Sequence, residues 1–457
     1  MKHLSGDDNL IKNARRIHLV GIGGSGMCPI AELLLSKGYS VSGSDKTESD
    51  NTKRLKSLGA KIFIGQSAGN IQGADIVGYS AAVHTDNPEL KAARESGIPT
   101  FERSKLLGAI TRFYDNTIGV SGTHGKTTVS SMITQILLLN KRDPSAVIGG
   151  KLPLAGSACV SGSSDTLVCE SCEFVDSFLE FSPDISVLLN IDNDHLDYFK
   201  TMDNLVASFS KFCNKSKTCY YNGDDELCEE AVSGIDAVKI SYGMGEDNFY
   251  HPANIKPGRF GFSFDVVRNN KTVGHLDMNV PGEHNIYNGI VSFAVCFDMG
   301  ASAGGINEAL KEFTGAGRRF QFIGEEAGVT VIDDYAHHPT EIAATLSAAR
   351  SIGFKNVIVV FQPFTYSRVA LLKDGMIKAL SIADKVFLTP IVASREENIY
   401  GVSSEEIANC VPGGKVISDY GQLSSEMAAS ASAGDIVITM GAGDIFKVAP
   451  MILEKLK

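Results

Sequence analysis

One segment of this chain leaves little choice of local fold, because an apolar strand turns through a glycine-rich loop into a helix. Residues 117–129 read Thr-Ile-Gly-Val-Ser-Gly-Thr-His-Gly-Lys-Thr-Thr-Val, and the apolar run continues to residue 139. A strand that turns sharply into a helix leaves unpaired N–H groups and the positive end of the helix dipole at the loop, and both favour phosphate. The segment therefore predicts a phosphate-binding loop within an α/β domain.

The residues at the end of this loop are those that a nucleotide triphosphate requires. Lys126 would place a cation on the β- and γ-phosphates, and the hydroxyl of Thr127 is a typical Mg²⁺ ligand. The strict pattern G-x-x-x-x-G-K is not met, because position 120 is Val. For the loop taken alone, a simple glycine–threonine turn without a ligand remains an alternative.

Size, composition and charge narrow the class of protein. The chain has 457 residues, which suggests about three domains, and its 43% hydrophobic and 21% charged residues are typical of a globular protein. A formal charge of −11 without a basic tract argues against nucleic acid or a membrane surface as partner. No run approaches the roughly 18 apolar residues of a membrane span, and the polar N-terminus does not resemble a signal peptide. The nine scattered cysteines favour a reducing, cytoplasmic location.

The first part of the chain, residues 16–114, alternates strand and helix patterns, which predicts a parallel, doubly wound sheet. Residues 21–26 read Gly-Ile-Gly-Gly-Ser-Gly, a G-x-G-x-x-G loop, and Asp45 follows at the end of the next predicted strand. This pattern alone is compatible with a dinucleotide, a sugar nucleotide or a packing turn. An NAD-dependent oxidoreductase is therefore an alternative, although it leaves the Gly-Lys-Thr loop without a role.

Two further parts follow. A second strand–loop–helix unit begins at Asn116, and segments 261–267 and 272–279 resemble antiparallel strands that extend its sheet. Glycines and arginines at 313–320 interrupt the pattern, after which strands and helices alternate again. We expect an α/β protein of three domains with boundaries at 1–114, 115–313 and 314–457.

Polar clusters follow several predicted strands, at the edge where open α/β sheets bind ligands. The strand near 185–189 leads into Asn190-Ile-Asp-Asn-Asp-His195, and the strand 166–169 ends in Glu170. A carboxylate and an imidazole at neighbouring strand ends are plausible Mg²⁺ ligands. A capped helix start for His195 and a surface acid for Glu170 are the alternatives.

Further motifs lie elsewhere in the chain. Cys169 and Cys172 form a C-x-x-C that lacks both a second pair for zinc and a redox context, so we interpret Cys169 as a strand core residue. Residues 333–341, Asp-Asp-Tyr-Ala-His-His-Pro-Thr-Glu, open a helix after a strand and predict either a polar site or a capped helix with solvated histidines. The loops at 361–363 and 441–445 are expected at the same sheet edge.

The order and spacing of these motifs resemble the Mur ligase family over nearly the whole chain. The motifs that carry the resemblance are Gly21–Met27, Ser80–Ala82, Asp86–Glu89, Gly122–Thr128, Asn190–His195, His284–Asn288, Gly315–Phe320, Asp333–Glu341, Phe361–Pro363 and Gly441–Ile445. The resemblance implies an N-terminal Rossmann-like domain for a UDP sugar, a central P-loop ATPase-like domain with a mostly parallel sheet, and a C-terminal Rossmann-like domain that closes over ATP and an amino acid.

The resemblance also implies an activity. It implies an ATP-dependent, Mg²⁺-requiring ligase of peptidoglycan precursor synthesis that joins L-alanine to the lactyl carboxylate of UDP-N-acetylmuramate through an acyl phosphate. Such an enzyme is cytoplasmic, does not insert into membranes, and is a monomer or a homodimer. Alternatives within the same fold are a ligase that adds a preformed peptide to the same sugar and a nucleotide-binding regulator without catalysis.

Residue roles carry over by position. The implied ATP-binding residues are Gly122, Thr123, His124, Gly125, Lys126, Thr127, Thr128, Asn285, Asn288, Arg319 and Asp334. The implied UDP-sugar-binding residues are Gly23, Ser25, Gly26, Met27, Asp45 and Ser80. The implied metal ligands are Thr127, Glu170 and His195, and the catalytic set is Lys126, Glu170, His195 and Arg319. Arg368 and His338 are the candidates for binding the amino acid.

Two segments depart from the family pattern. In the Glu-Ala-Asp-Glu-x-Asp motif that begins at Glu170, the third position is Cys172 and the later aspartate is displaced by one residue. After Gln362-Pro363 the usual His-Arg is replaced by Phe-Thr, which leaves Arg368 as the nearby cation for the amino-acid carboxylate.

Overall fold

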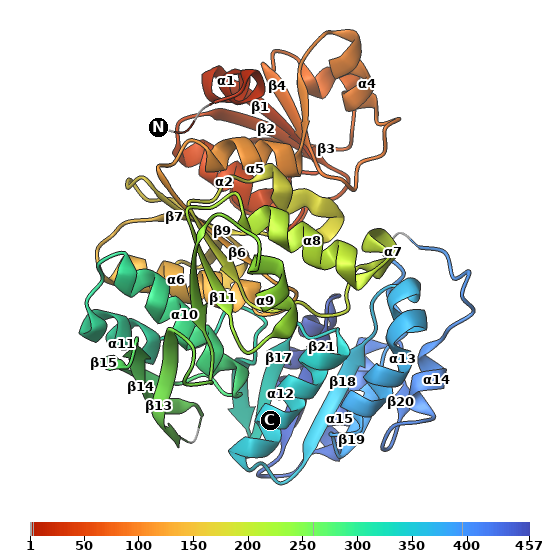
Figure 1. Ribbon diagram of the computed structural model, residues 1–457. Coiled ribbons are helices and arrows are strands. Elements are labelled where there is room, and N and C mark those ends of the chain that lie inside the picture. The colour runs from red at the N-terminus through yellow and green to blue at the C-terminus, as the bar shows by residue number, and fades with distance from the viewer. Residues whose placement is uncertain (1, 3, 259, 395) are drawn as a thin grey trace. The chain divides into compact units, whose positions relative to one another are not determined.

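The computed structural model describes residues 2, 4–258, 260–394 and 396–457. The chain forms three β-sheets with helices packed on them, so the predicted three-domain α/β fold with mostly parallel sheets is confirmed (Figure 1). The residues divide into two compact units. Unit 1 comprises Met1–Ala253, Asp265–Leu276 and Tyr287–Leu310, and unit 2 comprises Asn254–Phe264, Asp277–Ile286 and Lys311–Lys457. Among the described residues, no helix combines the length and the apolarity needed to cross a bilayer.

The first sheet lies in unit 1 and has the strand order β3-β2-β1-β4-β5, with every neighbouring pair parallel. The chain order reverses between β1 and β4, and ligands of such sheets bind at the carboxyl ends of the strands beside this point. The strands are β1 (Arg16–Val20), β2 (Ser40–Asp45), β3 (Lys61–Ile64), β4 (Ile76–Tyr79) and β5 (Thr100–Glu102). The helices are α1 (Gly6–Asn13), α2 (Cys28–Ser36), α3 (Asp50–Ser57), η1 (Ala68–Ile71), α4 (Pro88–Glu95) and α5 (Arg103–Thr111).

The second sheet has ten strands in the order β15-β14-β13-β12-β11-β10-β6-β9-β7-β8. Its strands are β6 (Asn116–Ser121), β7 (Ser145–Leu152), β8 (Ser157–Val160), β9 (Thr166–Glu170), β10 (Ile185–Leu188), β11 (Thr218–Asn222), β12 (Val238–Tyr242), β13 (Tyr250–Pro257), β14 (Phe262–Arg268) and β15 (Lys271–Met278). Its helices are α6 (Lys126–Leu139), η2 (Phe174–Glu180), α7 (Leu196–Phe199), α8 (Met202–Cys213), α9 (Glu226–Val232), α10 (His284–Asp298) and α11 (Ala303–Lys311). Strands β6, β9, β10, β11 and β12 pair in parallel, as expected for a phosphate-loop domain.

The antiparallel pair β7 and β8 was not expected from the sequence. Strand β7 contains Gly149 and Gly150, and glycines are typical of turns rather than strands. The structure explains Gly149, because a methyl group there would lie 2.4 Å from Oε1 of Glu170. A close tertiary contact, rather than local preference, therefore selects this residue.

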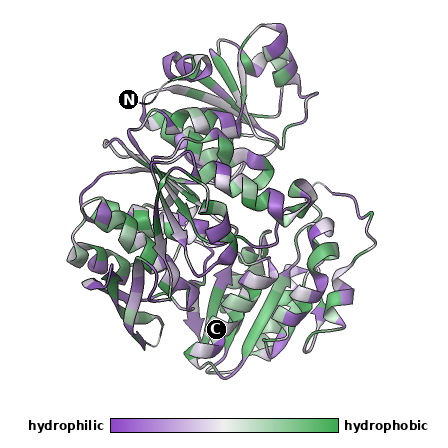
Figure 2. Ribbon diagram, in the orientation of Figure 1, coloured by the Kyte–Doolittle hydropathy of each residue, from purple (hydrophilic) through white to green (hydrophobic). Residues whose placement is uncertain are grey.

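The third sheet lies in unit 2 and has the order β16-β17-β21-β18-β19-β20, with β16 antiparallel to β17 and the other pairs parallel. Its central strands β18 and β21 are buried along their whole length and mainly apolar, as Figure 2 shows by their mainly green colour. The strands are β16 (Gln321–Glu326), β17 (Val329–Asp334), β18 (Val357–Gln362), β19 (Lys385–Leu388), β20 (Lys415–Val416) and β21 (Ile436–Gly441). The helices are α12 (Pro339–Ile352), α13 (Tyr366–Leu380), α14 (Ser404–Ala408), α15 (Tyr420–Ser430), η3 (Ile445–Lys447) and α16 (Val448–Leu456).

Candidate active site

The predicted phosphate loop lies between β6, which ends at Ser121, and α6, which begins at Lys126. Gly125 is the residue before the helix, with φ of +84°, and Gly122 has φ of +132°. Both values lie in the left-handed region, where glycine carries no steric penalty. A methyl group at Gly122 would also come within 2.9 Å of Cβ of Leu189. The two glycines thus let the backbone turn closely against the neighbouring strand end.

Hydrogen bonds fasten this loop to the segment that follows β10. The N–H of Thr123 donates to the carbonyl oxygen of Asn190 at 3.0 Å, and the N–H of His124 donates to Oδ1 of the same residue at 2.8 Å. The N–H of Asp192 donates to the hydroxyl of Thr123 at 2.9 Å, and its carboxylate lies 3.0 Å from Nε2 of His124. The loop is therefore held in shape before any phosphate arrives.

The ammonium of Lys126 is nearly buried and is held by the protein itself. It donates to the carbonyl oxygens of Gly122 and Thr123, and it pairs with the carboxylate of Glu173 at 2.9 Å. Burial is the largest single influence and lowers the pKa of Lys126, but the charge of Glu173, its hydrogen bond and the other nearby groups, Glu170 among them, together raise it more, so the net pKa lies above the ordinary value. Lys126 therefore carries a positive charge at physiological pH, as an anion site requires.

Two of the three predicted metal ligands lie together. The hydroxyl of Thr127 donates to Oε2 of Glu170 at 2.9 Å, and the N–H of Gly149 donates to the same oxygen at 2.7 Å. A hydroxyl and a carboxylate are the hard oxygen ligands that Mg²⁺ prefers. The donor set at the start of α6 and the end of β9 thus fits a divalent cation.

The third predicted ligand, His195, precedes α7 with φ of +58°. Its ring lies 4.8 Å from that of Phe174, and its Nε2 lies 3.6 Å from the carboxylate of Asp194. On α10, Oδ1 of Asn288 would be 3.2 Å from a methyl group on Gly125, so this amide lies against the phosphate loop. Asn285, near the start of the same helix, donates its amide hydrogen to the carbonyl oxygen of Pro281 at 2.6 Å.

The predicted sugar-nucleotide residues lie at the carboxyl ends of β1, β2 and β4. The N–H of Gly23 donates to Oδ2 of Asp45 at 2.9 Å, and Ser80 lies beside Gly21, with its Cβ 3.7 Å from the position of an added methyl group. Ser25 and Gly26 are exposed, whereas Met27 is buried in the core beneath the loop. The structure thus brings the G-x-G-x-x-G loop, the strand-end aspartate and Ser80 to one edge.

In unit 2, two consecutive arginines flank the ring of Tyr335. The guanidinium of Arg318 donates to Asp333 at 2.8 Å and to the carbonyl oxygens of Gly441 and Gly443, so it joins the ends of β17 and β21 and the loop that follows β21. The guanidinium carbon of Arg319 lies 5.1 Å from the centre of the Tyr335 ring.

Asp334 is buried and accepts hydrogen bonds from the backbone N–H groups of Phe320 and Ala336, both at 2.7 Å. Burial raises the pKa of its carboxyl group to about 6, although the positive charge of Arg319 acts in the opposite direction. A carboxyl group with such a pKa exchanges protons near physiological pH.

The candidates for the amino acid also lie in unit 2. His338 precedes α12 and accepts a hydrogen bond from the N–H of Thr340 at 3.4 Å, so it caps the helix. Arg368 is half-buried on α13. The amide of Gln362, at the end of β18, donates to the hydroxyl of Tyr420 at 2.9 Å and accepts from the N–H of Ile445 at 3.0 Å, which orders the neighbouring loops.

Family models match most of the chain. The Mur ligase family catalytic domain matches residues 16–115, the Mur ligase middle domain matches residues 120–296, and the Mur ligase glutamate ligase domain matches residues 318–443. The chain belongs to the Mur ligase family.

Relatives within the Mur ligase family are similar along their whole length. An enzyme named UDP-N-acetylmuramate–L-alanine ligase from Alkaliphilus metalliredigens is 42% identical over 96% of this chain and 97% of its own length. An enzyme of the same name from Caldicellulosiruptor saccharolyticus is 41% identical over 96% and 98%. The crystal structure of a UDP-N-acetylmuramate–alanine ligase from Thermotoga maritima superposes with a TM-score of 0.82 at 29% identity and covers 96% of this chain and 98% of that one.

Three residues of this Mur ligase site were not assigned from the sequence. Glu173 pairs with Lys126, and Asn190 and Asp192 hold the phosphate loop. All three lie in the polar clusters that follow β9 and β10, so their residue type and position marked them as candidate site residues. Their partners could not be assigned because several acids share each cluster.

The C-x-x-C of this chain is not built for redox chemistry. Burial raises the pKa of Cys169 to about 12 and that of Cys172 to about 11, so both remain thiols at physiological pH. Cys169 is fully buried within β9, which agrees with its interpretation as a core residue.

Proposed function

We propose that this chain is an ATP-dependent ligase that joins L-alanine to the lactyl carboxylate of UDP-N-acetylmuramate. The observation that carries the proposal is the similarity, at 40–42% identity and over nearly the whole chain, to enzymes named UDP-N-acetylmuramate–L-alanine ligase. The phosphate loop, with its charged lysine and adjoining carboxylate, supports it with chemistry that such a reaction needs.

The first step transfers the γ-phosphoryl group of ATP to the lactyl carboxylate and forms an acyl phosphate. Because two anions must meet, the site has to neutralise charge. We assign this role to Lys126, which exchanges Glu173 for phosphate oxygens, and to the N–H groups of the loop around Gly125. Asn288, Asn285, Arg319 and Asp334 are proposed to bind the rest of the nucleotide.

Mg²⁺ is proposed to bind at Thr127 and Glu170, with His195 as a further ligand. The metal supplies charge neutralisation and alignment of the phosphates when bound. In the protein itself, Gly149 orients the Glu170 carboxylate through its N–H, which keeps that oxygen beside the hydroxyl of Thr127.

In the second step, the amine of L-alanine attacks the activated carbonyl, and phosphate leaves. We propose that Arg368 and His338 bind the amino acid, and that Gly23, Ser25, Gly26, Met27, Asp45 and Ser80 bind the UDP sugar. Exclusion of water protects the acyl phosphate from hydrolysis.

We retain the boundaries 1–114, 115–313 and 314–457 for the three domains as a proposal, supported by the limits of the three sheets. A cytoplasmic location is also proposed, because all nine cysteines are free thiols. Whether the enzyme is a monomer or a homodimer stays a prediction.

The proposal is tested by phosphate release from ATP. Release should require both UDP-N-acetylmuramate and an amino acid, with L-alanine preferred in a panel that includes L-serine, glycine and a preformed tripeptide. Release that needs only the tripeptide would identify a peptide-adding ligase instead, and no release with any acceptor would contradict the proposal.

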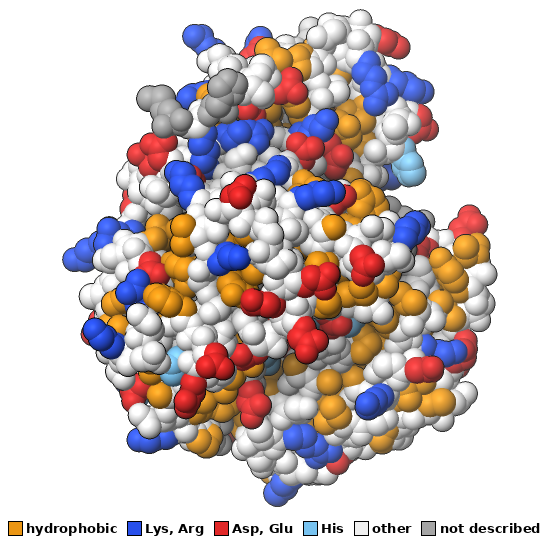
Figure 3. Space-filling view, in the orientation of Figure 1, with side chains coloured by type: hydrophobic (Ala, Val, Ile, Leu, Met, Phe, Trp, Pro, Cys, Tyr) orange, Lys and Arg blue, Asp and Glu red, His pale blue; other side chains and the backbone are white. Residues whose placement is uncertain are grey.

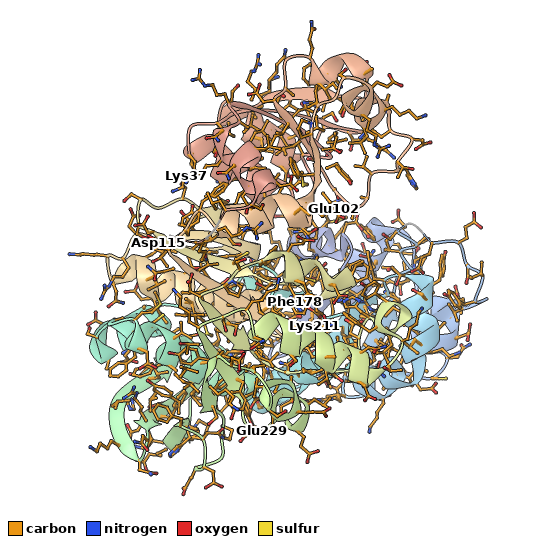
Figure 4. All side chains as sticks on the ribbon, turned by 45° about the horizontal axis from the view of Figure 1, so that its top comes forward. Lys37, Glu102, Asp115, Phe178, Lys211 and Glu229 are labelled. Atoms are coloured by element: carbon orange, nitrogen blue, oxygen red, sulfur yellow. The ribbon has the colours of Figure 1, made fainter. Side chains whose placement is uncertain are left out.

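The assignment of Lys126 has its own test. Lys126→Ala should abolish ligation but leave UDP-sugar binding near normal. The proposed ATP site lies at the second sheet, whereas the proposed UDP-sugar site lies at the first. Lys211→Ala, which changes an exposed lysine on α8 (Figure 4), is the matched control and should retain full activity. Undiminished ligation by Lys126→Ala would overturn the assignment.

A further inference from the structure

A cleft of about 1070 Å³ in unit 1 lies at the amino ends of the first sheet's strands. Arg16 and Ser40, the first residues of β1 and β2, line it, and residues 163–165, which lead into β9, form another part of its wall. Nucleotide sites of parallel sheets lie at the opposite, carboxyl ends of the strands. The cleft is therefore distinct from the sugar-nucleotide and ATP sites proposed above, and its size is in the range of small-molecule sites.

The cleft is cationic in an acidic protein. Four basic side chains line it, those of Lys12, Arg15, Arg16 and Lys37, against two acids, Asp75 and Asp165. On the N-terminal part of the visible face, Figure 3 shows several Lys and Arg side chains with Asp and Glu side chains between them, and the formal charge of the whole chain is −11. The local excess of positive charge favours an anionic ligand.

Asp75, one of the two acids, is hydrogen-bonded to the neighbouring arginines. Asp75 accepts hydrogen bonds from the N–H groups of Arg15 and Arg16, each at 2.8 Å, and pairs with the guanidinium of Arg16 at 2.9 Å. Within the described residues, the side chains of Lys12, Arg15 and Lys37 form no ion pair with a carboxylate. Lys37, which follows α2, donates to the carbonyl oxygen of Gly162 at 3.0 Å. Lys12 on α1, Arg15 just before β1 and Lys37 thus carry positive charges that no described carboxylate neutralises by an ion pair.

Aromatic rings lie beside these cations. The ammonium of Lys12 is 5.8 Å from the centre of the Phe113 ring, and that of Lys37 is 5.2 Å from the centre of the Tyr114 ring. Figure 4 labels Lys37 at the end of α2 and Asp115 just before β6, and both lie on the same side of the ribbon. Tyr39 adds a third, half-buried ring, and the apolar side chains of Leu33, Leu34 and Ile110 complete the lining.

One polar atom in the wall is left unsatisfied. Tyr114 is only 6% exposed, and among the described residues its hydroxyl group has no hydrogen-bond partner. Buried hydroxyl groups are normally paired, with protein or with a bound molecule. This hydroxyl group is shielded from solvent, so a molecule in the cleft reaches it only if the Tyr114 side chain shifts.

We propose that this cleft binds a small organic anion with a flat ring, of the nucleoside monophosphate class. The phosphate is bound by Lys12, Arg15 and Lys37, and the ring packs against Phe113 and Tyr39. Because the wall combines the first sheet with the loop before β9, a bound molecule contacts both and fastens them together. The site does not depend on the proposed ligase activity.

The chain has no Trp, so a single introduced indole reports on the cleft alone. We would titrate Phe113→Trp with uridine 5′-monophosphate, adenosine 5′-monophosphate, uridine and inorganic phosphate and follow indole fluorescence. A saturable change is expected with the nucleotides, with at least tenfold weaker binding of uridine and of phosphate. Combining the reporter with Arg15→Ala and Lys37→Ala should weaken nucleotide binding at least tenfold.

The matched control is Lys61→Ala, an exposed lysine at the start of β3 that also lies over an aromatic ring, 4.9 Å from the centre of Phe63, but does not line the cleft. It should leave binding unchanged. No saturable change, or equal loss in the Lys61→Ala control, overturns the proposal, and phosphate binding as tightly as the nucleotides overturns the role of the rings.

If Phe113→Trp does not fold, equilibrium dialysis of labelled uridine monophosphate replaces fluorescence. The unmodified chain should then bind one molecule more than Arg15→Ala/Lys37→Ala. Equal stoichiometry contradicts the proposal.

Discussion

The ammonium of Lys126 and the carboxylate of Glu173 form a buried pair that phosphate would have to replace. The side chain of Glu173 is 2% exposed and that of Lys126 is 13% exposed, so neither charge is well hydrated. Removing one member of such a pair leaves an uncompensated buried charge, which costs more than the pair itself contributes. The apo enzyme therefore depends on Glu173 for a stable phosphate loop.

We predict that Glu173→Gln lowers the free energy of unfolding of the nucleotide-free protein by about 3 kcal/mol. ATP should raise the melting temperature of the variant more than that of the unmodified protein, because phosphate replaces the lost counter-charge. Differential scanning calorimetry with and without ATP measures both effects. The exposed control Glu230→Gln should change neither, and an equal response to ATP in all three proteins would contradict the role of Glu173.

The raised pKa of Asp334 makes a prediction about pH. Since the folded pKa is about 6 and the ordinary value is 3.8, the folded protein binds the extra proton between these values. The stability that this proton contributes is present below about pH 4 and is lost as pH rises to about 6. Relative to Asp334→Asn, the unmodified protein should lose up to about 3 kcal/mol over that interval. Urea unfolding at several pH values tests this, and parallel stability curves for the two proteins would refute it.

Among the elements, the turn from β6 into α6 depends on Gly125. Its φ of +84° makes any side chain strained, and a methyl group would lie 3.2 Å from Oδ1 of Asn288 and 3.3 Å from Cδ1 of Leu189. Gly59, with φ of +100°, has nothing within 4 Å of an added methyl group. A side chain at either glycine would have a strained backbone, but only at Gly125 would it also contact neighbouring atoms.

Gly125→Ala and Gly59→Ala should each lower the free energy of unfolding by about 1–2 kcal/mol. Only Gly125→Ala should also weaken ATP binding, by tenfold or more, because the loop must shift away from Asn288. Isothermal titration calorimetry with ATP distinguishes the two. Unchanged ATP affinity in Gly125→Ala would show that the loop tolerates the displacement.

Across unit 1, helix α5 packs against the segment that ends η2. A methyl group at Gly108 would lie 2.4 Å from the carbonyl oxygen of Glu180, and Arg112 donates to the same oxygen at 2.8 Å. Gly108 is therefore what lets the first sheet's last helix approach the second sheet's domain. In α11, by contrast, Gly304 has open space around it.

We predict opposite signs for alanine at these two helical glycines. Gly304→Ala should stabilise the protein by up to about 1 kcal/mol through helix propensity. Gly108→Ala should destabilise it by about 1–3 kcal/mol, because the packed segments must separate. Urea unfolding of both variants provides the test. Stabilisation by Gly108→Ala would contradict the prediction, because it would show that α5 and the segment at Glu180 can separate without loss of stability.

The sequence by itself determined the α/β class, the phosphate loop at 122–128 and the polar strand ends, because these depend on residue spacing within a few turns of chain. Only the tertiary structure decided that Glu173 binds Lys126, that Glu170 meets Thr127, and that Asn190 supports the loop. These choices depend on which strands become neighbours and on how far each side chain is from water. The same holds for Gly149 in β7, where the Glu170 carboxylate leaves no room for a side chain, and for Asp334, whose pKa is raised by burial.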